Sequence, residues 1–209
     1  MRLLLILFFT VLVFSGCSRD EEVAVISTEF GDMVAEFFPE IAPKHVESFK
    51  ILAREGYFNN TTFHRVIPGF VIQGGDPNSK DTDRLNDGTG GRAGKYFGMG
   101  NPDDSSSWTI PAEFNDSLHV RGTLSMARTQ DPNSASSQFF ICVQPVPRLD
   151  RKYTVFGKII KGLAVIDSIV NVDTPQKQNS DYQGPDKDNP FDKVEMTVRI
   201  IPRSKALEK

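Results

Sequence analysis

Two polar side chains in an otherwise apolar segment are the first candidates for chemistry in this sequence. Residues 64–76 read HRVIPGFVIQGGD, and Arg65 and Gln73 stand in it among Val, Ile and Phe. An arginine guanidinium stays charged and presents several N–H groups in one plane, so it can serve as a fixed hydrogen-bond donor. Because burying either group without a partner costs free energy, the two side chains must be accounted for together.

Other catalytic signatures are missing from the sequence. The three histidines, His45, His64 and His119, lack the spacing of metal ligands, and no Ser-His-Asp set can be identified. The stretch GTGGRAGK is not a phosphate-binding loop, because no glycine stands at the required offset before Lys95 and Tyr96 replaces the hydroxyl residue. We therefore expect neither a metal nor a cofactor.

Size and charge indicate one globular domain without the basic charge that is typical of nucleic-acid-binding proteins. The chain has 209 residues, 39% of them hydrophobic and 16 of them Phe, which is enough for a substantial core. The net charge is −3 and the pI is about 5.7. Binding to nucleic acid is not expected from such a chain, and we expect a monomer.

The N-terminus predicts an exported lipoprotein. Residues 1–16 combine one Arg with a short apolar run, as a signal peptide does, and they end at Cys17. The ending resembles a bacterial lipobox, in which the cysteine carries lipid and becomes the mature N-terminus, although Phe14 stands where Leu is usual. A plain secretory signal with an incidental cysteine is the alternative. Residues 17–22 would form the acylated tether.

The predicted signal peptide and lipobox place the protein in the bacterial cell envelope, anchored to a membrane through lipid on Cys17. We expect the outer membrane, with the domain on the periplasmic side or at the cell surface. The acidic run SRDEE after the cysteine is either a surface-export signal or a solvated spacer. With Cys17 lipidated, Cys142 has no partner, so we expect no disulfide.

Periodicity predicts a mainly β chain. Residues 23–38 alternate around Gly31-Asp32 as a β-hairpin does, and Val46, Phe49 and Leu52 recur at helical spacing after Pro43. Further strands are expected on both sides of Pro68-Gly69, at 122–128, 137–143, 153–160 and 194–201, and a second helix at 162–170. The polar segments 77–108 and 171–192 are long loops. We predict a closed eight-stranded antiparallel β-barrel capped by two α-helices.

Four blocks carry a family resemblance: FHRVIPGFVIQGGD (63–76), GTGG (88–91), GTLSMAR with SSQFFI (122–141) and LDRKYTVFGKI (149–159). Together they resemble the cyclophilins, which are peptidyl-prolyl cis–trans isomerases. The resemblance implies the same barrel over residues 23–202, followed by a tail at 203–209. It also implies proline-containing polypeptides as partners, bound in a groove on the outside of the barrel.

The resemblance implies a site in which Arg65 and Gln73 are catalytic. Arg65 would donate to the imide nitrogen of a twisted X–Pro bond, and Gln73 would hold Arg65. The substrate would be bound by Phe70, Val71, Gly74, Ala127, Arg128, Gln138, Phe140, Leu149 and Tyr153. Alternation along a strand places Gln138 and Phe140 on one face and Phe139 on the other, toward the interior.

Three positions depart from the family pattern. Arg128 stands where animal members often carry Asn, Arg148 where many members carry Trp, and Tyr153 where the groove His stands. Catalysis should tolerate these changes, whereas cyclosporin binding, which depends on the Trp, should be weak. Alternative functions are a proline-peptide-binding chaperone or surface module with little catalysis, and, more remotely, a structural envelope protein.

Overall fold

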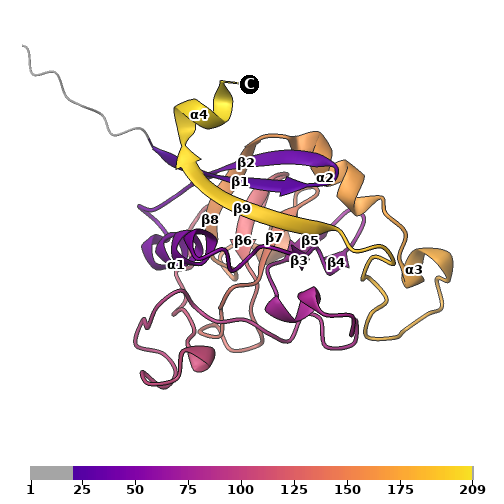
Figure 1. Cartoon of the computed structure of the whole chain (residues 1–209), viewed down its shortest axis with the longest axis horizontal. Coiled ribbons are helices and arrows are strands. Elements are labelled where there is room, and N and C mark those ends of the chain that lie inside the picture. Colours follow the sequence, from indigo (N-terminus) through magenta and orange to yellow (C-terminus); the bar gives the residue numbers. More distant parts are fainter. Residues whose placement is uncertain (1–20, 209) are drawn as a thin grey trace, which may run out of the picture.

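The computed structural model describes residues 21–208, so the expected signal peptide, Cys17 and most of the tether lie outside the described residues. One curled antiparallel sheet dominates the fold, with strand order β3-β9-β1-β2-β8-β6-β7-β5-β4 (Figure 1). The strands are β1 (Glu22–Thr28), β2 (Gly31–Phe37), β3 (Thr61–Thr62), β4 (Arg65–Val66), β5 (Val71–Gly74), β6 (Thr123–Met126), β7 (Phe139–Cys142), β8 (Val155–Lys161) and β9 (Glu195–Pro202).

Helices are few and short. The α-helices are α1 (Pro43–Arg54), α2 (Leu163–Val170), α3 (Pro175–Gln178) and α4 (Arg203–Leu207), and the 3₁₀ turns are η1 (Pro77–Lys80), η2 (Ser105–Ser107) and η3 (Pro147–Leu149). In Figure 1, α1 and α2 lie toward opposite ends of the sheet. The mainly β class and the two principal helices are confirmed, and the expected tail begins with the short helix α4. No helix between residues 21 and 208 is long and apolar enough to cross a bilayer.

The closed eight-stranded barrel is a wrong prediction, because the sheet is open and has nine strands. The edge strands β3 and β4 are two residues long and separated only by Phe63 and His64, and no ladder pairs them. Amides of this segment donate to other parts of the chain: Phe63 N donates to Val194 O at 3.0 Å, and Val66 N, in β4, donates to Asp188 O at 2.8 Å. Phe63 and His64 therefore link the two edge strands covalently, and no hydrogen-bonded strand pairing closes the sheet into a barrel.

The first hairpin is confirmed, but its turn lies two residues earlier than predicted. Thr28 pairs with Gly31, so Glu29 and Phe30 form the turn, and Gly31 opens β2 with a φ of +117°. That conformation favours glycine, which explains why the glycine lies at the end of the turn. The second predicted turn holds, since Gly69 adopts a φ of +71° between β4 and β5.

A cluster of phenylalanines fills the interior. The ring of Phe49, on α1, lies 4.9 Å from that of Phe58, 5.4 Å from that of Phe139 and 5.5 Å from that of Phe156. All four side chains are buried, and each contributes about 1.5–3 kcal/mol through burial. The predicted helical face is confirmed, because its apolar residues all face this core.

Strand β7 separates the core from a second, smaller apolar cluster. Phe139 and Ile141 belong to the interior cluster, whereas Phe140 and Cys142 belong to the other one. This is the period-two alternation expected of a strand, and it confirms the sequence-based assignment of Phe139 to the interior. Arg65 and Gln73, the polar residues of segment 64–76, lie beside this outward cluster.

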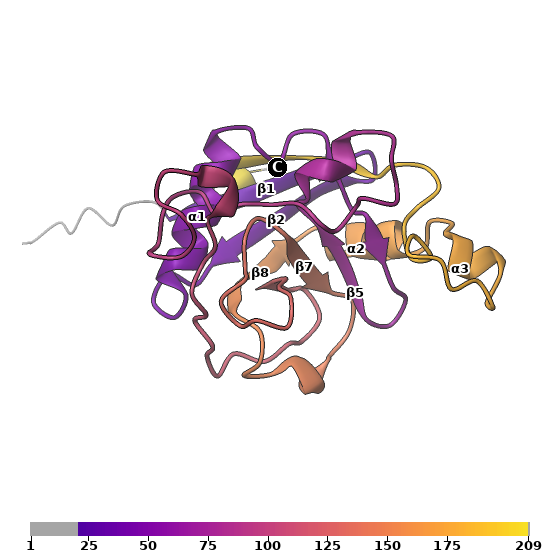
Figure 2. The ribbon, with the colours of Figure 1, turned by 90° about the horizontal axis from the view of Figure 1, so that it is seen from below.

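The two long loops are tied to each other. Nη2 of Arg84 donates to Asn189 O at 2.7 Å, and Nδ2 of Asn189 donates to Oδ2 of Asp87 at 2.6 Å. Nζ of Lys193 adds a hydrogen bond to Ser79 O at 2.9 Å. The part that contains α3 projects from the side of the domain (Figure 2). The two segments, far apart in sequence, thus form one layer beside β4.

Candidate active site

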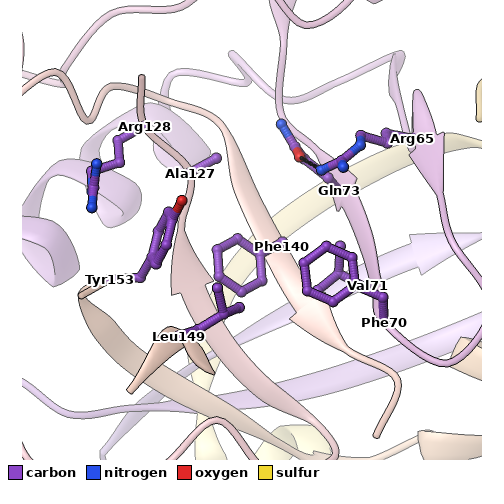
Figure 3. A pocket seen from close by; sticks show the side chains of 9 residues that line it. All are labelled: Arg65, Phe70, Val71, Gln73, Ala127, Arg128, Phe140, Leu149 and Tyr153. Carbon is purple, nitrogen blue, oxygen red and sulfur yellow. Dashed lines mark hydrogen bonds between the residues drawn. The ribbon is translucent and has the colours of Figure 1, made fainter. Parts of the chain in front are cut away.

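A shallow groove of about 100 Å³ lies on the outward face of β5 and β7. Its lining comes from β4, β5, β7, the 3₁₀ turn η3 and the segments that flank these elements, and Figure 3 shows the side chains around it. The lining residues are Arg65, Phe70, Val71, Gln73, Ala127, Arg128, Phe140, Leu149 and Tyr153. All nine are among the residues that the sequence analysis assigned to the site.

The floor of the groove is apolar. Phe140 lies at its centre, with Tyr153 on one side and Phe70 on the other (Figure 3), and the Phe140 and Tyr153 rings are 5.8 Å apart. Val71 and Leu149 complete the cluster. A pocket of this size and composition suits a small apolar ring such as that of proline, because burial of apolar surface drives binding.

A buried histidine supports this floor from behind. The ring of His119 stacks on Phe140 at 6.0 Å with an interplanar angle of 17°, while its Nδ1 lies 3.0 Å from Asp150 Oδ1 and its Nε2 lies 3.1 Å from Ser125 Oγ. Burial lowers the pKa of His119, although Asp150 opposes that shift. His119 is therefore held against the back of Phe140, a contact that the sequence analysis did not predict.

Register places the polar residues along one edge of the groove. Arg65 pairs with Gln73 across β4 and β5, and Gln73 pairs with Phe140 across β5 and β7. Both polar side chains therefore emerge on the same face as Phe140, because paired residues share a face of the sheet. Figure 3 shows Arg65 and Gln73 together at this edge.

A relay of side-chain amides fixes the position of Arg65. Nη1 of Arg65 donates to Oε1 of Gln73 at 3.2 Å, and Nε2 of Gln73 donates to Oε1 of Gln138 at 3.0 Å. Nε2 of Gln138 donates in turn to Gly90 O at 2.7 Å. Because a carbonyl only accepts and a guanidinium only donates, the two ends of the relay dictate the orientation of both amides.

Asp188 holds Arg65 from the other side, and sequence reasoning missed it. Its Oδ2 lies 3.8 Å from Nε of Arg65, and its carbonyl oxygen accepts from Val66 N. The Arg65 side chain keeps 42% of its surface exposed. The guanidinium is therefore anchored by an amide and a carboxylate while part of it faces the groove.

Two predicted residues lie outside the groove lining. Gln138 acts through the relay and lines the adjacent pocket of about 230 Å³. Gly74 faces the interior: a Cβ at this position would stand 2.5 Å from Met196 Cε and 2.8 Å from Thr62 O. Gly74 is therefore not among the groove-lining residues, and close packing alone requires a glycine there, so its part in substrate binding stays a prediction.

The remaining titratable groups do not point to acid–base or metal chemistry. Burial lowers the pKa of His64 to about 4, so its side chain is neutral at physiological pH. Over residues 21–208, no group of three or more His, Cys, Asp or Glu side chains is arranged to hold a metal ion. The site offers a fixed cation, two amides and an apolar pocket.

Comparisons with known proteins point the same way. The family model for cyclophilin-type peptidyl-prolyl cis–trans isomerases matches residues 23–197. The chain is 41% identical over 177 residues to a probable peptidyl-prolyl cis–trans isomerase of Brucella abortus (strain 2308), covering 83% of each chain. It is 41% identical over 170 residues to the human peptidylprolyl isomerase domain and WD repeat-containing protein 1, covering 80% of this chain and 23% of that one.

The fold is also similar to a solved structure. A cyclophilin-type peptidyl-prolyl cis–trans isomerase of Cryptosporidium parvum, crystallised in the presence of the dipeptide Ala-Pro, superimposes with a TM-score of 0.69 at 30% identity. The match covers 86% of this chain and 98% of that one.

Proposed function

The chain belongs to the cyclophilin-type peptidyl-prolyl cis–trans isomerase family, and on that premise we propose that Arg65 drives X–Pro rotation in proteins of the cell envelope. Isomerase activity follows from the family. The roles of individual residues, the clients and the location are the proposal.

The reaction needs no nucleophile, metal or cofactor. The C–N bond before proline has partial double-bond character, and rotation about such bonds faces a barrier of about 18–20 kcal/mol. Twisting that bond localises the lone pair on the imide nitrogen. A donor aimed at this nitrogen binds the twisted state more tightly than either planar state, and this difference in binding lowers the barrier.

The observation that carries the proposal is the geometry of Arg65. One of its N–H groups is committed to Gln73 and its Nε side faces Asp188, so the guanidinium is held in place. It borders a pocket whose floor is Phe140 and whose size suits a proline ring. A preorganised donor of this kind stabilises the transition state without reorganising during the reaction.

Substitution of Arg65 tests this role. In a prolyl-peptide isomerisation assay, Arg65→Ala should lower kcat/KM by about 10²- to 10³-fold, the effect typical of removing a transition-state donor. The fold should persist, because the side chain is 42% exposed. Arg54→Ala, on α1 and 51% exposed, is the matched control and should keep full activity.

Two results would redirect the proposal. An Arg65→Ala enzyme as fast as the wild type would remove this side chain from the mechanism. A wild-type protein that binds prolyl peptides but does not accelerate their isomerisation would favour a binding chaperone. Arg128, Arg148 and the long loops would then serve peptide binding and not catalysis.

The proposed location in the cell envelope depends on the N-terminal sequence alone. The signal-like residues 1–16 and the lipobox-like ending at Cys17 support a lipid anchor on the cysteine. Metabolic labelling with a radioactive fatty acid should mark the wild-type protein and not Cys17→Ala, and the substitution should move the protein from the membrane to the soluble fraction. Labelling of both proteins alike would exclude Cys17 as the anchor.

A further inference from the structure

We infer that the groove selects prolyl bonds flanked by acidic side chains, with Arg128 and Arg148 as the residues that determine this preference. The inference rests on the proposed function and adds a substrate class to it. It is carried by the charges that rim the groove: within residues 21–208, Arg128 and Arg148 form no ion pair, whereas Arg65 is paired with Asp188.

Three guanidinium groups surround the apolar floor. Arg148 lies over the ring of Phe70 at 4.4 Å, and Arg65 lies 5.8 Å from the same ring. Arg128 lies over the ring of Tyr153 at 4.5 Å. Since Tyr153 and Phe70 stand on opposite sides of Phe140 (Figure 3), Arg128 and Arg148 mark opposite ends of the groove.

Arg128 is fixed in place but keeps its charge. Its Nη1 donates to Thr129 O at 2.8 Å, and its Nη2 donates to Lys152 O at 2.8 Å. Carbonyl oxygens orient a guanidinium without cancelling its positive charge. Between residues 21 and 208, Arg128 has no carboxylate oxygen within 4.0 Å, in contrast to Arg65 with Asp188.

Arg148 is still more available. Its side chain is exposed, its guanidinium carbon lies over the Phe70 ring, and within the described part of the chain it makes no hydrogen bond or ion pair. Asp150, two residues on, is turned away, because its Oδ1 accepts from His119 N at 2.8 Å and lies 3.0 Å from His119 Nδ1. The N–H groups of Arg148 are therefore free to bind a carboxylate on a substrate.

This local charge runs against the charge of the chain as a whole. The protein carries a net charge of −3, yet three cations gather around one small pocket with Asp188 as the carboxylate paired to one of them. A peptide lying across the floor passes one cation on each side of its proline. Glutamate or aspartate next to the proline should be attracted there, and lysine should be repelled.

The test compares peptides that differ only in charge. Cis–trans exchange of short peptides with Glu, Gln or Lys directly before or directly after the proline is measured by NMR exchange spectroscopy with the full-length enzyme. Glu and Gln have nearly the same size, so their ratio of kcat/KM isolates the charge. We expect Glu to exceed Gln by about 1.4- to 5-fold at low salt, the worth of one exposed ion pair, because each peptide places one carboxylate beside one cation.

Substitutions assign the preference to residues. Arg128→Gln and Arg148→Gln should each lower the Glu/Gln ratio about 1.4- to 5-fold at one of the two peptide positions. Arg199→Gln, which removes the same charge from an exposed position on β9, is the matched control and should leave the ratio unchanged. An equal effect of the control would assign the preference to net charge and overturn the inference.

A measurement without substitutions guards against misfolded variants. Raising the salt to about 1 M, where the Debye length is about 3 Å, should bring the wild-type Glu/Gln ratio close to one. Equal rates for Glu, Gln and Lys peptides at low salt would overturn the preference and leave the isomerase intact. Failure to accelerate any peptide, including one with Ala before proline, would overturn the proposed function as well.

Discussion

Replacing Gln138 with leucine should slow catalysis about tenfold, although Gln138 does not line the groove floor. Its Nε2 donates to Gly90 O, which fixes the orientation of the Gln138 amide. Its Oε1 then accepts from Gln73 and so fixes the orientation of the side chain that holds Arg65. Leucine has a similar volume and no polar atoms. Gln73 would then be free to rotate its amide by half a turn and present N–H groups to a guanidinium that can only donate.

The expected size of the effect follows from the hydrogen bonds lost. A hydrogen bond to a charged group contributes about 1.5–3 kcal/mol, and water reaches the partly exposed Arg65, so we expect the lower end of that range. About 1.4 kcal/mol corresponds to a tenfold change in kcat/KM. The free energy of unfolding should fall by about 1–3 kcal/mol, because Gly90 O and Asp76 also lose their contact with the buried amide.

Prolyl-peptide isomerisation and urea unfolding measure the two effects separately. Ile141→Val, on the same strand but facing the core, should cost about 0.5–1.5 kcal/mol of stability and leave kcat/KM unchanged. In a Gln73→Ala background, Gln138→Leu should have little further effect on activity, because the relay is already broken. A Gln138→Leu enzyme within twofold of the wild-type kcat/KM would show that the relay does not position Arg65.

Three further predictions concern buried groups and the groove. Burial lowers the pKa of His64 to about 4, so between about pH 6.5 and pH 4 the unfolded chain binds a proton at His64 that the folded chain does not. The free energy of unfolding should therefore decrease as the pH is lowered from about 6.5 to 4, by on the order of 2–3 kcal/mol. Urea titrations should show that His64→Gln removes most of this slope, and an unchanged slope would contradict the assignment. Burial raises the pKa of Cys142 to about 12, so in a Cys17→Ser protein a thiol reagent should label this side chain only after unfolding; rapid labelling in native buffer would contradict its burial. Cyclosporin should bind weakly, because Arg148 stands where many family members carry Trp, and calorimetry showing tight submicromolar binding would refute this.

Patterns that depend on near neighbours in sequence were predictable. The spacing of Val46, Phe49 and Leu52 predicted a helix that the structure confirms, because helical periodicity is a local property. Alternation along β7 likewise predicted that Phe139 and Phe140 would face opposite sides. The family resemblance then supplied which face forms the groove, and the structure brings nine of the named residues to one pocket.

Features that depend on distant loops were not predictable. Asp188 lies in a polar, Pro-rich segment without periodicity, and nothing in its neighbours indicates that it approaches Arg65. The open sheet was missed because the segment before Pro68 reads as one strand, whereas Phe63 and His64 divide it into β3 and β4. The close packing of Gly74 was also missed, because the strand pattern does not reveal how closely Met196 approaches it.

The alternation along β7 also bears on how the enzyme becomes active after synthesis. The pairing that seats Phe139 among the interior rings is the same pairing that sets Gln73 opposite Phe140. A slip of one residue would turn Phe140 inward and leave Phe139 facing water, so a chain with a well-formed interior has a competent groove as well. Recovery of turnover during refolding should therefore keep pace with interior burial, with no separate maturation step afterwards.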